Sequence, residues 1–112
     1  MTKTDIKVAE ELFVKCVPGI LKNHIDKIII YGSCARGDFN DDSDIDIAIL
    51  TTCDRIEAKK YDDKLMEIVT EIAMKTQAIV EYICIPVTEY MEKKSWYGYF
   101  KNIENEGRVI YG

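Results

Sequence analysis

Two carboxylates separated by one residue stand in the middle of an apolar stretch of this sequence. Asp44 and Asp46 lie in a run that is typical of a strand, where side chains two positions apart project from the same face. Desolvating carboxylates costs free energy, so a compensating partner is expected. The pair suits Mg²⁺, a hard cation that binds a few carboxylates together with substrate phosphates. The alternative is a pair of solvated acids at the entrance to a strand.

Glu81 is a third carboxylate in an unusual position. It shares its strand face with three isoleucines, so the row is otherwise apolar. If its strand lies beside the strand of Asp44 and Asp46, the three acids converge. Three convergent acids are what two-metal phosphoryl or nucleotidyl transfer requires. The alternative for Glu81 is a salt bridge to a Lys or Arg on a neighbouring element.

Gly32 and Ser33 end the apolar strand that precedes Asp44 and turn directly into a short helix. Glycine lets a ligand approach the backbone closely, the serine hydroxyl adds a donor, and the unpaired amides of such a turn suit phosphate oxygens. On its own, a Gly-Ser pair is also common in ordinary turns. Beside the acids, it predicts a site for the phosphates of a nucleotide.

The hydrophobic pattern predicts the elements that must position these residues. It predicts helices over 5–16, 55–75 and 95–105, and strands over 27–31, 44–50 and 78–85. Thr4 is a candidate N-cap for the first helix, and Pro18-Gly19 is expected to end or kink it, with one further turn through Ile20 and Leu21 as the alternative. A short extended segment closes the chain. The order predicts one α+β domain over 1–112, with a small mixed three-stranded core sheet flanked by helices.

Composition limits the classes of function. The chain has 112 residues, 47% of them apolar, and a formal net charge of −5. A long nucleic-acid footprint, which depends on clustered Lys and Arg, is therefore not expected, and no apolar run is long enough to span a membrane. Four cysteines without a CxxC pair and the absence of a secretory signal favour free thiols and a cytoplasmic protein.

The phosphate turn and the acids together resemble a known signature. Gly32-Ser33, a ten-residue gap and Asp44-x-Asp46 resemble the DNA polymerase beta-like nucleotidyltransferase superfamily. Within it, "GSCARGDFNDDSDIDIAIL" is similar to the minimal nucleotidyltransferases, the short MntA-like proteins often paired with a HEPN-domain protein in bacteria and archaea. The closing "YFKNIENEGRVIYG" is similar to the end of these short proteins.

The resemblance implies a role for each matching residue. Gly32 and Ser33 would hold the triphosphate of ATP, and Arg36 would contact phosphate or brace the loop. The catalytic acids Asp44, Asp46 and Glu81 would bind Mg²⁺. The chain departs from the family pattern in having Cys34 where many members carry Arg or a bulky residue, and Glu81 where Asp is frequent.

The resemblance also implies a partner. Larger nucleotidyltransferases add a helical domain for which this chain has no residues, so a second protein is expected to complete the site. That partner would be a HEPN toxin whose tyrosine hydroxyl receives AMP, making this chain an antitoxin. The alternatives are a binding module that neutralises its partner by contact, and small-molecule nucleotidylation. Self-association into a homo-oligomer stays open.

A dense aromatic group precedes and enters the last predicted helix. It comprises Tyr90, Trp96, Tyr97, Tyr99 and Phe100. Packing of that helix into the core accounts for such a group. A patch that binds a partner is the alternative, because aromatic residues are enriched at protein interfaces.

Overall fold

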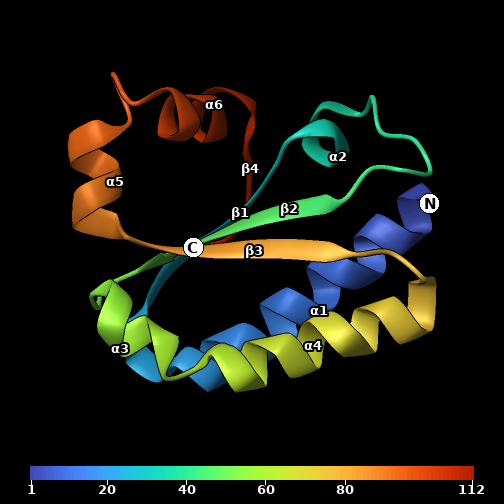
Figure 1. The fold of residues 1–112 in the computed structure, drawn as a ribbon, viewed down its shortest axis with the longest axis horizontal. Coiled ribbons are helices and arrows are strands. Elements are labelled where there is room, and N and C mark those ends of the chain that lie inside the picture. The colour runs from blue at the N-terminus through green and yellow to red at the C-terminus, as the bar shows by residue number, and fades with distance from the viewer.

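A four-stranded mixed sheet separates two layers of helices in a computed structural model that describes residues 1–112 (Figure 1). The helical elements are α1 (Lys3–Leu21), η1 (Lys22–His24), α2 (Ser33–Arg36), α3 (Arg55–Lys59), α4 (Asp62–Thr76), α5 (Val87–Lys93) and α6 (Gly98–Glu106). The strands are β1 (Ile25–Tyr31), β2 (Ile45–Thr51), β3 (Val80–Pro86) and β4 (Arg108–Tyr111). The predicted α+β class is confirmed.

The strands lie in the order β3-β2-β1-β4. β1 pairs antiparallel with both β2 and β4, whereas β2 and β3 pair parallel across the α3–α4 connection. The predicted strand number of three was wrong, because the closing segment forms β4. Its four residues show no apolar alternation and are half-buried or exposed, so only the long-range pairing with β1 makes them a strand.

One face of the sheet is covered by α1 and α4 (Figure 1). The isoleucines of β2 that alternate with its acids all point to this side, and Ile45, Ile47 and Ile49 are completely buried there. Each fully buried isoleucine contributes about 1.5–3 kcal/mol relative to an exposed one. This core fixes the register of β2, so Asp44 and Asp46 are directed to the other face.

The second face is only partly covered. Tyr90 of α5 and Phe100 and Ile103 of α6 pack on the far half of this face, against residues such as Ala48 and Leu50. The near half, toward the start of β2, carries the acids and is bordered by α2. Figure 1 shows α2 on the same side of the sheet as α5 and α6, so the uncovered surface lies between them.

Several helix boundaries differ from the prediction. Thr2, and not Thr4, caps α1, in a capping box with Asp5. The helix continues through Pro18 to Leu21, because the single hydrogen bond lost at Pro18 is offset by the complete burial of Val17 and Leu21. The helix predicted over 55–75 divides into α3 and α4. The short helix α5 directly follows Pro86 and was not predicted.

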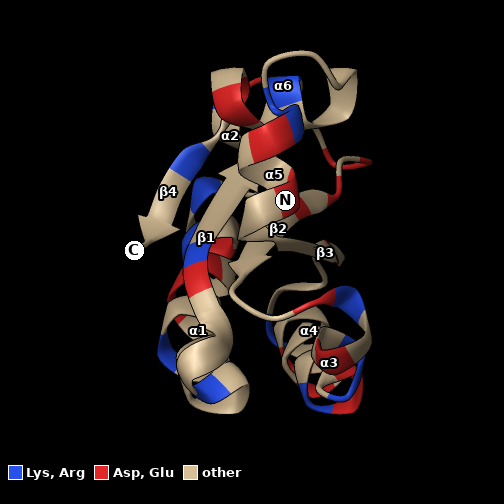
Figure 2. Cartoon of the chain, turned by 90° about the vertical axis from the view of Figure 1, so that its left-hand side faces the viewer, with Lys and Arg blue, Asp and Glu red and all other residues tan.

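Charged residues of both signs are mixed along the helices, as Figure 2 shows for α3, α4 and α6. Such mixing agrees with the net charge of −5 and with the absence of a basic stripe from the sequence. None of the helices combines the length and the apolarity needed to cross a membrane.

Candidate active site

The turn after β1 brings its backbone against an acid of β2. Gly32 caps α2 with a φ of 75°, a conformation that a side chain strongly disfavours. A Cβ atom at this position would lie 2.5 Å from Oδ2 of Asp46. The missing side chain therefore makes room for the carboxylate, and the phosphate turn and the acid are in contact.

The strand register aligns the acids on one face. Asp46 pairs with Glu81 in the parallel β2–β3 ladder, and Asp44 lies two residues before Asp46. The Glu81 carboxyl lies close enough to Asp44 for Asp44 to raise its pKa. We call Asp44, Asp46 and Glu81 the acid row. The structure thus brings together the three acids singled out in the sequence, whereas their catalytic roles stay predictions.

Like charges raise the pKa values of two members of the row. The hydrogen bond to Asp44 and the charge of Asp44 raise the pKa of the exposed Glu81 carboxyl. Burial raises the pKa of Asp46, the charge of Asp44 adds to this, and Arg36 opposes it. The ionised carboxylates therefore repel one another, and a proton or a cation between them relieves that repulsion.

The row is not a ready-made metal cage. No three Asp, Glu, His or Cys side chains are placed so that they could hold one metal ion together. The donor chemistry nevertheless suits Mg²⁺, which commonly takes one or two carboxylates and completes its shell with water and substrate phosphates. The adjoining Gly32 turn is where such phosphates would lie. The residues thus fit a cation shared with a nucleotide, and metal binding stays a prediction.

Arg36 makes bracing contacts at the border of the turn. It donates to Asp38 at 3.2 Å and to Glu106 at 2.9 Å, and so ties α2 to the end of α6. These two hydrogen bonds raise the pKa of the guanidinium. Arg36 also lies close enough to Asp46 to lower the pKa of that carboxyl. It is therefore positioned at the border of the row, with its phosphate role untested.

Cys34 faces the core and not the turn. It is buried, with its Sγ atom 3.5 Å from the backbone oxygen of Asp44, and burial raises the pKa of its thiol. Cys34 thus packs into the core next to the backbone of Asp44. All four cysteines are free thiols.

Tyr31 is a residue of the site that the sequence interpretation missed. It pairs with Asp46 across β1 and β2, and its hydroxyl is 2.5 Å from the hydroxyl of Tyr99. Burial, followed by the contact with Tyr99, raises the pKa of Tyr31 far above its ordinary value. The sequence feature that could have identified Tyr31 as a residue of the site is its position at the end of a strand, immediately before Gly32.

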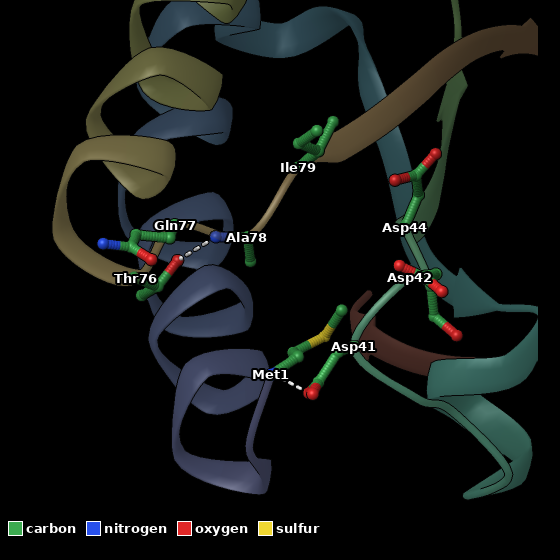
Figure 3. Close-up of a pocket in the computed structure, with 9 residues that line it drawn as sticks. Met1, Asp41, Asp42, Asp44, Thr76, Gln77, Ala78 and Ile79 are labelled. Atoms are coloured by element: carbon green, nitrogen blue, oxygen red, sulfur yellow. Dashed lines mark hydrogen bonds and ion pairs between the residues drawn. The ribbon is translucent and has the colours of Figure 1, made fainter.

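A cavity of about 540 Å³ opens beside Asp44. Figure 3 shows Asp41, Asp42 and Asp44 on one wall and the segment from Thr76 to Ile79, which leads into β3, on the other. Its volume falls within the range of small-ligand pockets. One acid of the row therefore borders this partly open cavity.

Comparison with known proteins identifies the family. The family model described as polymerase beta, nucleotidyltransferase matches residues 16–112. Two proteins of Methanocaldococcus jannaschii named as candidate protein adenylyltransferases are each 32% identical to this chain. One alignment covers 88% of this chain and 91% of the relative, and the other covers 70% and 76%. The chain belongs to the polymerase beta nucleotidyltransferase family, and the protein is thus a nucleotidyltransferase.

Solved structures share the fold at lower identity. A toxin–antitoxin structure with AMP-PNP matches with a TM-score of 0.58 and 19% identity, covering 92% of this chain and 73% of that one. The complex of a tri-AMPylated Shewanella oneidensis HEPN toxin with its MNT antitoxin matches at 0.54 and 18%, covering 96% and 72%. A candidate nucleotidyltransferase from Sulfolobus solfataricus matches at 0.52 and 20%, covering 95% and 82%. The family resemblance seen in the sequence is confirmed.

Proposed function

We propose that this protein transfers AMP from ATP to a hydroxyl group of a HEPN-type toxin and thereby acts as its antitoxin. The observation that carries the proposal is the contact between Asp46 and the Gly32 turn, with Glu81 opposite Asp46. This contact supports a site in which the turn binds phosphate and the neighbouring acids bind a cation. The names of the relatives as protein adenylyltransferases and the shared fold of the MNT antitoxin support the choice of reaction and partner.

Each part of the site has a role in such a transfer. The backbone amides of the turn at Gly32 and Ser33 hold phosphate oxygens of the nucleotide. An acceptor hydroxyl oxygen forms a bond to the α-phosphorus, the bond from that phosphorus to the pyrophosphate oxygen breaks, and pyrophosphate leaves. The hydroxyl proton passes to a carboxylate or to water. Mg²⁺ held by the acid row would make the hydroxyl more acidic and neutralise charge on the pyrophosphate.

The open face explains why a protein is proposed as acceptor. Glu81 is exposed, and Asp44 and Asp46 are half-buried, so the acid row reaches solvent. Water can reach a nucleotide bound on such a face, and a second protein would exclude it while presenting its own hydroxyl.

Mass measurement tests the transfer directly. The purified chain is mixed with the HEPN-domain protein encoded by the neighbouring gene, ATP and Mg²⁺, and the intact masses of both proteins are recorded. We expect the HEPN protein to gain one or more adenylyl groups. The double variant Asp44→Asn, Asp46→Asn should leave its mass unchanged, whereas Asp63→Asn, a matched change of an exposed acid on α4, should act like the wild type. An unmodified HEPN protein with the wild-type chain contradicts the proposal.

A second candidate, neutralisation by contact alone, is favoured by one observation. Arg36, the cation nearest to the turn in sequence, is engaged in ion pairs with Asp38 and Glu106. The double variant Asp44→Ala, Asp46→Ala separates the two functions in a growth assay with the toxin. Loss of neutralisation supports transfer, and full neutralisation supports contact.

A further inference from the structure

We propose that an exposed aromatic groove beside the acid row binds an acidic, partly apolar segment of the acceptor protein. The inference deepens the proposed function, on which it rests, by naming where the acceptor docks. The groove lies between β3, α5 and the start of α6, and its cavity volume is about 550 Å³. We call it the aromatic groove; it is lined by Arg55, Ile83, Glu89, Lys93, Trp96, Tyr97, Tyr99 and Phe100.

The aromatic residues of the C-terminal part divide into two groups. Tyr90 and Phe100 are buried in the core, as packing of the last helix predicts. Trp96, Tyr97 and Tyr99 remain 66%, 45% and 43% exposed. Large aromatic side chains that the fold leaves in water are the residue types that most often anchor protein interfaces. Core packing thus accounts for only part of the aromatic group.

The groove is continuous with the acid row at two points. Ile83 lies two residues after Glu81 on β3, so both side chains are on the same face of the sheet. The hydroxyl of Tyr99 contacts Tyr31, which pairs with Asp46. A segment held in the groove therefore has a short path to the row along either contact.

The turn and the groove are formed by different residues. The turn meets the acid row where Gly32 lies against Asp46, whereas the lining of the groove includes no residue of the turn and reaches the row through Ile83 and Tyr99. ATP can thus occupy the turn while an acceptor occupies the groove. Transfer of AMP between two bound reactants needs this arrangement.

Charge selects the kind of segment that fits. Arg55 and Lys93 both pair with the single carboxylate of Glu89, at 2.8 Å and 3.2 Å. The lining therefore holds two cations against one anion, in a chain whose formal net charge is −5. A positive groove in an acidic protein favours an acidic partner segment by electrostatic complementarity.

Trp96 is the single tryptophan of the chain, so its fluorescence reports on the groove alone. The double variant Asp44→Asn, Asp46→Asn is titrated with the HEPN-domain protein of the neighbouring gene after that protein's own tryptophans have been changed to phenylalanine. We expect a saturable spectral shift with the protein and none with ATP. Steady-state transfer assays should show that Trp96→Ala raises the KM for the acceptor about tenfold or more, while the KM for ATP is unchanged.

Two further variants separate docking from damage to the fold. Met74→Ala, at an 82% exposed methionine on α4, is the matched control and should leave both KM values unchanged. Trp96→Phe should restore most of the acceptor affinity. Lys93→Glu should weaken acceptor binding most strongly at low salt.

Two outcomes would overturn the docking site. One is transfer that proceeds while Trp96 does not respond to the acceptor. The other is a shift with ATP alone together with a raised KM for ATP in Trp96→Ala, which would assign the groove to the nucleobase. If the wild-type chain transfers nothing but Trp96 still reports acceptor binding, AMP transfer fails and the docking site stands.

Discussion

Asp46 lies opposite Glu81 in the parallel ladder of β2 and β3, and on its other side it pairs with Tyr31 of β1. The central strand thus holds a carboxylate between a tyrosine and a second carboxylate, on a face that the helices leave open. This geometry favours ligand binding over folding, because two ionised acids directly opposite each other destabilise a sheet.

Removal of charge from the acid row should separate activity from stability. Asp46→Asn keeps the shape of the side chain but removes its repulsion with Asp44 and Glu81. We expect AMP transfer to fall by about 10²–10³-fold while the melting temperature stays equal to or above that of the wild type. Circular dichroism melts and the mass assay measure the two effects. A variant that melts earlier and keeps its activity would show that Asp46 is structural.

Gly32→Ala should damage both the fold and the site. Its φ of 75° with a ψ of −157° lies in a region that residues with a side chain rarely adopt, and the new Cβ would meet Asp46. We expect a loss of about 1–3 kcal/mol in the free energy of unfolding and a strong loss of ATP binding. Urea denaturation and calorimetry with ATP measure these quantities.

Gly19→Ala is the matched control for that variant. Gly19 lies inside α1, and a Cβ there would meet no atom within 4 Å. Alanine should stabilise the helix by about 0.5–1 kcal/mol and leave ATP binding unchanged. If both substitutions had the same effect on the free energy of unfolding and on ATP binding, Gly32 would have no special role.

The raised pKa values of Glu81 and Asp46 predict a pH dependence of stability. Their ordinary values are 4.5 and 3.8, so the unfolded chain releases these protons at lower pH than the folded protein does. The free energy of unfolding contributed by these groups therefore falls as pH rises through and above this range. Glu81→Gln should show a smaller fall between pH 4 and pH 7 in urea titrations.

Glu67→Gln, on the exposed side of α4, is the control for the pH experiment and should follow the wild-type profile. Mg²⁺ should stabilise the wild type at pH 7, where the row is ionised, and much less at pH 4. A wild-type pH profile in Glu81→Gln would mean that the contact with Asp44 does not strain the folded state.

Paired variants decide the role of Arg36. Arg36→Ala removes both the brace and any phosphate contact, whereas Glu106→Gln weakens the brace and keeps the guanidinium. If Arg36 turns to the phosphates when ATP binds, Arg36→Ala should weaken ATP binding about tenfold, and Glu106→Gln should leave it equal or tighter. Calorimetry measures both. Similar weakening in the two variants would show that Arg36 acts only as a brace.

The strand carrying the acids could be predicted from its alternation. The isoleucines between Asp44 and Leu50 fix which side faces the core, so the acids had to share the opposite side. The placement of Glu81 depended on β3 lying next to β2, a long-range pairing that no local pattern specifies. Its observed register, with Glu81 opposite Asp46, came only from the structure.

The errors lie where tertiary contacts outweigh local signals. Pro18 is a helix breaker by propensity, but buried neighbours carry α1 past it. The seven residues of α5 are too few for a periodic pattern, and Tyr90 at its centre is held by the sheet and α6. The bracing role of Arg36 was among the expectations, but Glu106 as its partner could not be predicted, because the two residues are distant in the sequence.

The parallel pairing of β2 with β3 across α3 and α4 has a consequence for how activity emerges. Glu81 joins Gly32 and Asp46 only after that long connection has closed, and closure of distant segments is the slow part of folding. A chain arrested before this event would have the contact between Gly32 and Asp46 but not the complete acid row. Enzymatic activity should therefore recover together with the last kinetic phase of refolding. The rate of AMP transfer would then measure the fraction of molecules that has reached the native state.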